Sequence, residues 1–355
     1  MISSNARKFL LASLALIVAA FCVQAATPAK AGPAKKHTVA PAAATPVKKN
    51  PNTISRDPYY GAVVIDASTG MILHEDHASA IAYPASMVKL MNLFLILDDV
   101  KSGKLRMDEP VTVAREVAQV GARQVWLKEG EVFPLEELIY AMVIHSANDA
   151  AAALAIRASG SREAHIARMN TKASELGLRN TTFHSVHGLP PGPGQEDMSS
   201  ALDMALLSKA LLIVHPETLK YTSISTRSFR ENNPVQLTSS NKLLGVVPGC
   251  DGLKTGYFSN AGFSIAATAL RNGQRVIAVV LGSEDKKVRD AKAAELIEKG
   301  FARIPPPPPV VIEPVPEVVV IEPVVEKKHG FIFPVLAALF VVAAGTIFIR
   351  RRLKR

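Results

Sequence analysis

The chain has 355 residues, of which 48% are hydrophobic, so it can form one large domain or two modest ones. Its formal net charge is +10, but residues 56–304 contain 27 Lys and Arg against 27 Asp and Glu, and the basic surplus lies entirely in the two ends. A nucleic-acid-binding groove requires a basic bias on the folded part. The sequence therefore predicts no nucleic-acid partner.

The first 26 residues have the pattern of a secretory signal peptide. Arg7 and Lys8 precede an apolar stretch over residues 9–21, and small residues around Ala25 offer a cleavage site. We therefore expect residues 1–26 to be a signal peptide that directs the rest of the chain across the cytoplasmic membrane.

The next segment, residues 27–55, is rich in Ala, Pro and Lys and shows no apolar period. This composition predicts a disordered basic leader. Cleavage after Ala25 would remove Cys22 and leave Cys250 as the only cysteine, which excludes an intrachain disulfide. We interpret Cys250 as a buried, inert thiol.

Residues 56–304 are predicted to form one folded domain of mixed secondary structure. Short β-type segments lie near both of its ends, long apolar segments of helical length lie in the middle, and Asn272-Gly273 is a hairpin signal. This order indicates an α+β fold, with an antiparallel sheet covered by helices and an inserted helical lobe. The predicted strands are 61–66, 71–74, 262–270 and 275–281, and the predicted helices are 86–100, 135–144, 149–158 and 288–302.

The C-terminal part has the composition of a membrane anchor. Residues 305–330 begin with five prolines and predict an extended spacer, which at about 3.1 Å per residue would reach on the order of 80 Å. Residues 331–349 carry no charge and would form a transmembrane helix about 28 Å long at 1.5 Å per residue. The basic residues of 350–355 predict a cytoplasmic tail. We therefore expect a single-pass protein of the cytoplasmic membrane with its folded domain on the periplasmic, or extracytoplasmic, side.

The segment Ser86-Met87-Val88-Lys89 is the first of three candidate chemical motifs. On a helix, positions i and i+3 share a face, so the hydroxyl of Ser86 and the amine of Lys89 can meet. A serine becomes a nucleophile when a base removes its proton, and a lysine can act as that base when burial or nearby positive charge lowers its pKa. The apolar residues around this motif favour such burial.

The second motif is Ser146-Ala147-Asn148, in the break between two predicted helices. A hydroxyl and an amide on this loop could relay a proton and hold a substrate amide, although both residue types are also common helix caps.

The third motif is Lys254-Thr255-Gly256, placed before a predicted edge strand. Lys254 and Thr255 could bind a carboxylate, and Gly256 would permit a close backbone approach.

Each motif is weak by itself, because Ser-x-x-Lys spacing recurs at Ser239/Lys242 and at Ser283/Lys286. The combination of all three in this order carries the signal. The chain resembles the low-molecular-weight penicillin-binding proteins, the serine-type D-alanyl-D-alanine carboxypeptidases (peptidase S11-like). The segments that carry this resemblance are Tyr83–Met91, Leu138–Ala150, Met169-Asn170, Leu176–Leu178, Asn180–Phe183, His187–Leu189 and Gly249–Gly256.

The resemblance implies a fold like that of penicillin-binding proteins and serine β-lactamases, and it implies roles for individual residues. Ser86 would be the acylated nucleophile and Lys89 its general base, while Ser146 would assist proton transfer. The implied substrate-binding residues are Asn148, Lys254, Thr255, Gly256, Tyr257 and Arg289. The backbone N–H groups of Ser86 and Tyr257 would form the oxyanion hole. Arg289 either binds a carboxylate or is a surface helix charge near Asp285 and Asp290.

The implied reaction is removal of the terminal D-Ala from the pentapeptide of peptidoglycan, with β-lactam antibiotics as inhibitors and no cofactor. A DD-endopeptidase that cleaves cross-links would use the same residues and is the main alternative. A β-lactamase is disfavoured, because no Glu-x-x-Leu-Asn motif lies between Ser146 and Lys254. A non-catalytic cell-wall binding protein is disfavoured, because all three motifs are intact.

Other chemistries find little support in the sequence. The pairs His74/His77 and His184/His187 have i, i+3 spacing, but neither pair sits beside a Cys or Glu ligand pattern, so we expect no metal site. No Gly-x-Ser-x-Gly elbow occurs, which disfavours an α/β-hydrolase. The chain also departs from many relatives by Phe258 after Lys-Thr-Gly-Tyr, and by prolines from Pro305 where a second, β-rich domain often follows.

Overall fold

A computed structural model describes residues 53–304. The predicted signal peptide, Pro-rich spacer, transmembrane helix and basic tail lie outside this range, as does most of the predicted leader. Within residues 53–304, none of the helices is both long and apolar enough to cross a membrane.

The strands are β1 (Gly61–Asp66), β2 (Ile72–Asp76), β3 (Pro110–Thr112), β4 (Val132–Pro134), β5 (Thr226–Phe229), β6 (Val235–Thr238), β7 (Cys250–Phe258), β8 (Gly262–Arg271) and β9 (Gln274–Ser283). The helices are the 3₁₀-helix η1 (Ala85–Val88), α1 (Lys89–Lys101), α2 (Arg115–Ala118), α3 (Leu135–Ile144), α4 (Asn148–Ser159), α5 (Arg162–Glu175), α6 (Ala201–Val214), α7 (Thr218–Thr222) and α8 (Lys286–Arg303).

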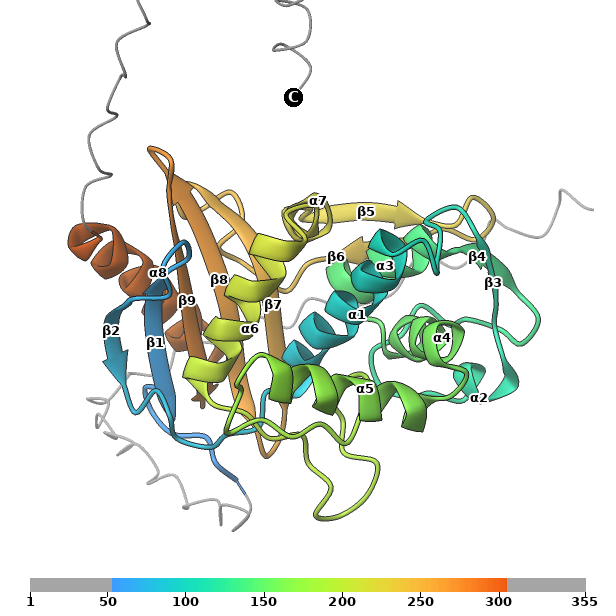
Figure 1. Cartoon of the computed structure of the whole chain (residues 1–355), viewed down its shortest axis with the longest axis horizontal. Helices are drawn as coiled ribbons and strands as arrows, with labels where there is room; N and C mark the ends of the chain where they lie inside the picture. The colour runs from blue at the N-terminus through green and yellow to red at the C-terminus, as the bar shows by residue number, and fades with distance from the viewer. Residues whose placement is uncertain (1–52, 305–355) are drawn as a thin grey trace, which may run out of the picture. The chain divides into compact units, whose positions relative to one another are not determined.

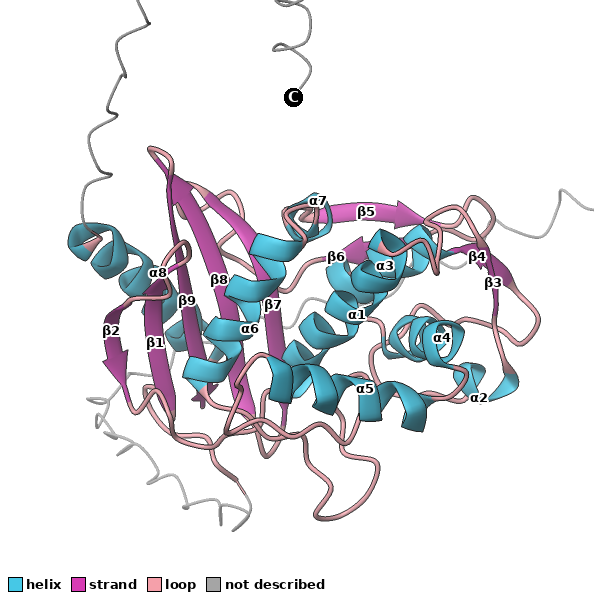
Figure 2. Ribbon diagram, in the orientation of Figure 1, coloured by secondary structure: helices cyan, strands magenta, loops and turns pink. Residues whose placement is uncertain are grey.

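The main sheet is antiparallel and joins the two ends of the domain. Its strand order is β2-β1-β9-β8-β7, so β1 from the start of the domain pairs with β9 near its end, and β7 is an edge strand (Figure 1). The sheet and the helices form an α+β fold, which confirms the predicted class (Figure 2).

Both faces of the sheet are apolar, and side-chain alternation explains why. On β9, Ile277 and Val279 pack into the core that includes residues of α6 and the helical lobe, whereas the neighbouring Ala278 and Val280 pack against α8. Such two-sided burial gives an almost continuous apolar strand sequence. Helix α8 lies so close to the sheet that a Cβ atom on Gly300 would come within 2.8 Å of the side chain of Val64.

The β8–β9 hairpin turns at Asn272-Gly273, as predicted. Both residues have positive φ angles, 49° and 76°, and the flanking Arg271 and Gln274 face each other across the strands. Two central residues with positive φ define the type I′ turn, which suits the twist of a hairpin. The turn chemistry therefore fixes the register of the two longest strands.

In sequence, the predicted helical lobe is inserted between strands β2 and β7 of the main sheet. In space, helices α1 to α5 are grouped beside the sheet (Figure 1). Helix α1 is buried over most of its length, consistent with its strongly apolar sequence. Its first residue, Lys89, is also buried, although its side chain ends in an amine. The lobe and the edge strand β7 together position the candidate site.

The start of the ordered domain differs slightly from the predicted boundary at Arg56. The backbone N–H of Ile54 donates to the carbonyl of Asn260 at 3.0 Å, and Ser55 contacts the backbone at Gly262. Residues that the sequence assigned to the leader therefore contact the sheet. The hydrogen bond from Ile54 to Asn260 satisfies a backbone N–H group that would otherwise lack a partner.

Candidate active site

Ser86 and Lys89 lie at the junction of η1 and α1, and their side chains meet. The Nζ atom of Lys89 is 3.1 Å from Ser86 Oγ, 2.8 Å from Asn148 Oδ1 and 2.7 Å from the carbonyl oxygen of His187. Lys89 is only 1% exposed, whereas Ser86 lies on the surface of a cleft. The structure thus places a buried amine directly beneath an accessible hydroxyl.

The environment of Lys89 favours its neutral form. Burial lowers its pKa well below the usual value, and the positive charges of Lys254 and Arg123 lower it further. The carboxylates of Asp197 and Asp149 act in the opposite direction. The depressed pKa means that Lys89 can accept a proton from its hydroxyl neighbour.

The Ser146-Ala147-Asn148 motif occupies the break between α3 and α4, as predicted. Ser146 adopts a positive φ of 62°, which ends the first helix, and Asn148 begins the second. The amide of Asn148 accepts from Lys89 and donates to the carbonyl of Gly121 at 3.1 Å. Ser146 lines the same cleft as Ser86, so the structure brings the first two motifs together.

The third motif lies inside the edge strand β7, rather than before a strand as we predicted. Thr255 and Gly256 line the cleft, whereas Lys254 is 4% exposed and donates to the carbonyl of Thr255 at 3.0 Å. Because successive strand residues point to opposite faces, Lys254 and Thr255 do not present their side chains together. Burial and the charges of Arg123 and Arg289 lower the pKa of Lys254 to about 7.

The close backbone approach expected at Gly256 is present, and it is made to the nucleophile segment. A Cβ atom on Gly256 would lie 2.4 Å from the carbonyl oxygen of Pro84, and one on Gly188 would lie 2.1 Å from that of Ala85. Gly188 also has a φ of +94°. Two backbone segments thus press against the start of η1 and fix the position of Ser86.

Arg289 is not the surface charge that the sequence left open. It is 4% exposed and lines the cleft, where it forms an ion pair with Asp290 at 2.7 Å and donates to the carbonyl of Ser264 at 3.2 Å. Burial lowers its pKa, and the neighbouring Asp290 raises it. The guanidinium is therefore available to the cleft from one side.

Sequence reasoning missed Arg123, which lies on the loop before β4 and lines the cleft. Its guanidinium spans to the end of β6, donating to the Ser240 hydroxyl at 2.9 Å and to the Thr238 carbonyl at 3.0 Å. Its own carbonyl accepts from the N–H of Asn148 at 2.8 Å. Only spatial proximity connects this arginine to the motifs, so its sequence neighbourhood contained no signal.

A second missed element is the turn that carries His187 and Gly188. Buried Asp197 accepts from the Ser185 hydroxyl at 2.6 Å, and Ser185 Oγ in turn accepts from the Gly188 N–H at 2.7 Å. These bonds hold the His187 carbonyl against Lys89. Residues 187–189 contribute to the resemblance, but no sequence pattern indicated this contact with Lys89.

Ser86 opens into a cleft of about 980 Å³ between the helical lobe and β7. Its rim on the β7 side is aromatic: Tyr257 stacks on Phe263 with ring centroids 4.2 Å apart, and Phe258 stacks on Tyr83 at 5.9 Å. Tyr257 is 53% exposed. The cleft therefore combines an apolar rim with polar groups converging on one hydroxyl, which is typical of a ligand site.

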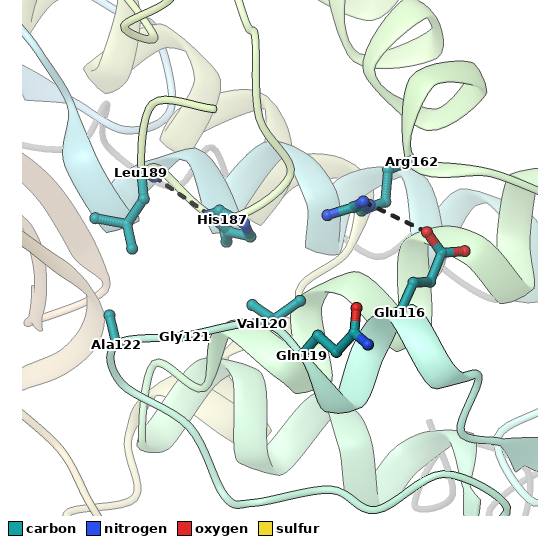
Figure 3. Close-up of a pocket in the computed structure, with 8 residues that line it drawn as sticks. All are labelled: Glu116, Gln119, Val120, Gly121, Ala122, Arg162, His187 and Leu189. Atoms are coloured by element: carbon teal, nitrogen blue, oxygen red, sulfur yellow. Dashed lines mark hydrogen bonds and ion pairs between the residues drawn. The ribbon is translucent and has the colours of Figure 1, made fainter. Parts of the chain in front are cut away.

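A smaller cavity of about 460 Å³ adjoins the cleft, and Ala122 and Leu189 line both. We call it the side pocket; Figure 3 shows the residues that line it, which are Glu116, Gln119, Val120, Gly121, Ala122, Arg162, His187 and Leu189 (Figure 3). Glu116 and Arg162 lie at the end opposite Ala122 and Leu189. The side pocket is thus an extension of the cleft with a charged end.

Residues 53–304 contain no group of three or more His, Cys, Asp or Glu side chains that could hold a metal ion. Cys250, which we expected to be buried, is partly exposed; its Sγ lies 3.6 Å from the Gly252 carbonyl, and burial raises its pKa.

Comparisons with known proteins show the family of this chain. Residues 48–285 match the peptidase S11 family model, described as D-alanyl-D-alanine carboxypeptidase. The D-alanyl-D-alanine carboxypeptidases DacF of Bacillus subtilis and DacC of Escherichia coli are 36% and 35% identical, over 68% and 67% of this chain and 62% and 60% of their own lengths. The chain thus spans about 60% of the length of these relatives.

Solved structures show the same likeness. Penicillin-binding protein D2 of Listeria monocytogenes, in its ampicillin-bound form, aligns with a TM-score of 0.63 at 35% identity, covering 69% of this chain and 97% of that one. Penicillin-binding protein 6B of Escherichia coli gives a TM-score of 0.64 at 34% identity, over 72% and 80%. The fold, the three assembled motifs and the match over residues 48–285 lead to one conclusion: the chain belongs to the D-alanyl-D-alanine carboxypeptidase family, peptidase S11.

Proposed function

We propose that this protein is a serine D-alanyl-D-alanine carboxypeptidase that removes the terminal D-Ala from peptidoglycan stem peptides. The observation that carries the proposal is the buried Lys89 amine 3.1 Å from the Ser86 hydroxyl, at the floor of a cleft bordered by both other motifs. A lysine held neutral by burial next to an accessible serine is suited to acyl transfer. Family membership supports the choice of substrate.

In the proposed mechanism, Lys89 takes the proton of Ser86 as Oγ attacks the carbonyl carbon of the D-Ala–D-Ala bond. The backbone N–H groups of Ser86 and Tyr257 would stabilise the oxyanion. The proton then goes to the leaving D-Ala nitrogen, with Ser146 as the relay. Water then attacks the carbonyl carbon of the resulting ester and gives a proton to Lys89. The bond between Ser86 Oγ and the acyl carbon breaks, Oγ takes this proton back from Lys89, and the shortened peptide leaves with a new terminal carboxylate.

The substrate-binding roles follow from position in the cleft. Asn148 would bind the peptide amide through the second lone pair of Oδ1 and the second hydrogen of Nδ2, since Lys89 and the Gly121 carbonyl take only one of each. Thr255 and Arg289 line the cleft and would bind the terminal carboxylate. Lys254 would contribute its charge from a buried position, from which it also lowers the pKa of Lys89.

Binding of β-lactams follows from the same chemistry. The Listeria relative is described in ampicillin-bound and cefotaxime-bound forms. We expect the β-lactam ring to acylate Ser86 here and to leave a long-lived ester.

Intact-mass analysis with benzylpenicillin tests the proposal. A stable adduct mapped to Ser86, absent in Ser86→Ala and present in the exposed control Ser223→Ala, is expected. Release of D-Ala from a pentapeptide should follow the same pattern, and the absence of both adduct and release in the wild type would refute the proposal. Digestion of cross-linked muropeptides in parallel reports DD-endopeptidase activity as loss of dimers.

We also propose that residues 1–26 are a signal peptide, 27–55 a leader, 305–330 a spacer, 331–349 a transmembrane helix and 350–355 a cytoplasmic tail, with residues 56–304 as the catalytic domain outside the membrane. The uncharged run and the basic cluster after it support this arrangement. Alkaline extraction of membranes containing the full chain, compared with a chain ending at residue 330, tests it. Full release of both proteins into the soluble fraction would contradict the anchor.

A further inference from the structure

Trp126 is the only tryptophan of the chain, and it faces solvent beside the active-site cleft. It lies three residues after Arg123, which lines the cleft, and it is 58% exposed. A tryptophan contributes a large apolar area when it enters a core. Its exposure here therefore indicates a role other than packing.

The backbone holds Trp126 in this outward position. Its φ angle is +56°, a left-handed conformation that is unfavourable for a bulky residue. On either side of it, the N–H groups of Val125 and Leu127 donate to the buried carboxylate of Asp149, at 3.1 and 3.0 Å. The carbonyl of Trp126 accepts from Arg230 Nη2 at 2.9 Å. Backbone strain that is maintained by so many contacts is typical of binding sites.

The indole ring is also fixed at its polar edge. In the orientation that satisfies both of its groups, the amide of Gln124 accepts from Trp126 Nε1 at 3.2 Å and donates to the Val120 carbonyl at 2.7 Å. Val120 lines the side pocket, so this network connects the ring to the wall of that pocket. Because the ring is already oriented, a ligand would not have to immobilise it.

The surroundings of the ring favour a sugar over a protein surface. Along residues 116–136, Val132 is the one other large apolar residue that is exposed, whereas Lys128 and Glu129 are exposed and charged. Interfaces between proteins use contiguous apolar patches. A pyranose ring has C–H groups on its face and hydroxyl groups at its edge, so it can stack on the electron-rich indole face and keep its edge in polar surroundings.

The proposed substrate carries such a ring within reach. Four residues of the stem peptide separate the D-Ala–D-Ala bond from the sugar, and at about 3.6 Å per residue they span up to about 14 Å. The step from Arg123 to Trp126 covers at most about 11 Å on the same scale. Arg123 is itself near the nucleophile, because its charge adds to the burial and the Lys254 charge that lower the pKa of Lys89. A stem peptide that reacts in the cleft can thus place its sugar at Trp126.

We propose that Trp126 is a stacking platform for a sugar ring of the glycan strand that carries the stem peptide. The indole face would contact the C–H face of the sugar. This inference rests on the proposed carboxypeptidase function and adds a binding site to it: a muropeptide would bind through its sugar as well as through its peptide end.

The test compares D-Ala release by the full chain from one pentapeptide, either free or joined to the N-acetylglucosamine–N-acetylmuramic acid disaccharide. We expect kcat/KM to be about tenfold higher for the disaccharide-linked peptide, on the scale of one aromatic stacking contact. Trp126→Ala should bring the two values together, and Trp126→Phe should retain part of the difference. Ile213→Ala is the matched control, because Ile213 is also 58% exposed but lies in the last turn of α6 and does not line the cleft. It should keep the tenfold ratio.

Fluorescence provides a second measurement that needs no variant. Because Trp126 is the only tryptophan, its emission reports binding directly. Titration of the wild type with a peptide-free tetrasaccharide of the same two sugars should shift the emission to shorter wavelength and saturate. This titration decides the inference if Trp126→Ala fails to react with benzylpenicillin and so lacks an assembled cleft.

The other outcomes separate this inference from the proposed function. Equal kcat/KM for the two substrates in an active wild type would overturn the inference and leave the function intact. A tenfold ratio that survives in a Trp126→Ala variant with normal benzylpenicillin acylation would also overturn it. If neither substrate releases D-Ala, the proposed function fails, and an emission spectrum unchanged by the tetrasaccharide would refute the sugar site separately. Self-association that Trp126→Ala abolishes, with no effect of sugar, would instead assign the ring to contact with a second copy of this chain.

Discussion

The backbone of Gly256 passes so close to Ser86 that a Cβ atom at position 256 would lie 3.2 Å from the Ser86 nitrogen. The same atom would lie 2.4 Å from the Pro84 carbonyl oxygen, below the 3.0 Å that real Cβ contacts respect. The edge strand and the nucleophile segment therefore fit together only if residue 256 is glycine.

Gly256→Ala should separate these two segments and displace the reactive hydroxyl. Because misplacement of a reacting group by about 1 Å can cost 10²-fold in rate, we expect benzylpenicillin acylation to slow by about two orders of magnitude. Gly192→Ala is the control, because its Cβ atom would meet only the flexible Gln195 side chain at 3.4 Å. Similar acylation rates in both variants would show that the contact does not position Ser86.

The pH dependence of acylation should show that the positive charge of Lys254 lowers the pKa of Lys89. Burial, followed by the Lys254 charge, lowers the pKa of Lys89, and acylation requires the neutral amine. The rate should therefore fall as pH drops through the pKa of Lys89. Lys254→Gln removes a positive charge, so the pKa of Lys89 rises. The acidic limb of the pH–rate profile, which is the range where the rate falls with decreasing pH, therefore moves to higher pH.

Acylation rates measured from pH 5 to pH 10 test this expectation, with Lys242→Gln as a control that removes an exposed charge from the cleft. An acidic limb at the same pH in Lys254→Gln and in the wild type would show that the two amines are not coupled.

Arg123→Gln should weaken both binding and catalysis. The guanidinium ties the loop before β4 to Ser240 and Thr238 across the cleft, and it adds positive charge near Lys254. We expect KM for a D-Ala–D-Ala peptide to rise about tenfold, on the scale of a lost charged hydrogen bond. The acidic limb should also move to higher pH. Arg115→Gln, an exposed substitution outside the cleft, should change neither quantity.

Asp149→Asn should destabilise the fold through the same loop. Oδ2 of the buried carboxylate accepts from the backbone N–H groups of Val125 and Leu127, at 3.1 and 3.0 Å, and Oδ1 accepts from the N–H of Ala150 at 2.9 Å. An amide has one acceptor atom and one donor atom, so Asp149→Asn would leave a donor facing a backbone N–H group. We expect a loss of about 3 kcal/mol in the free energy of unfolding. Asp108→Asn, in an exposed pair with Arg106, should stay within about 0.5 kcal/mol. Urea denaturation of both variants provides the measurement.

Local chemistry explains which parts of this structure could be predicted. The Asn272-Gly273 turn and the apolar segments of β8, β9 and α1 follow from rules that act within a few residues, and the structure confirms them. The resemblance identified the three motifs, which the structure brings to one cleft.

The remaining features depend on contacts between distant segments. Arg123 reaches the cleft through its partners at 238 and 240, more than 100 residues away. Lys254 is turned into the protein because β7 alternates its side chains, and Arg289 is buried because α8 packs on the sheet. The partial exposure of Cys250 and the contacts of Ile54 have the same origin. No local pattern contains this information.

The three hydrogen-bonding neighbours of Lys89 also determine how its neutral amine is oriented. An ammonium has three N–H bonds and could donate to all of its neighbours, but a neutral amine has two N–H bonds and one lone pair. The carbonyl groups of His187 and Asn148 can only accept, so the two N–H groups of the neutral amine donate to them. The lone pair is then directed at Ser86, whose hydroxyl must become the donor. Two fixed acceptors thus give the proton transfer its direction before any substrate arrives.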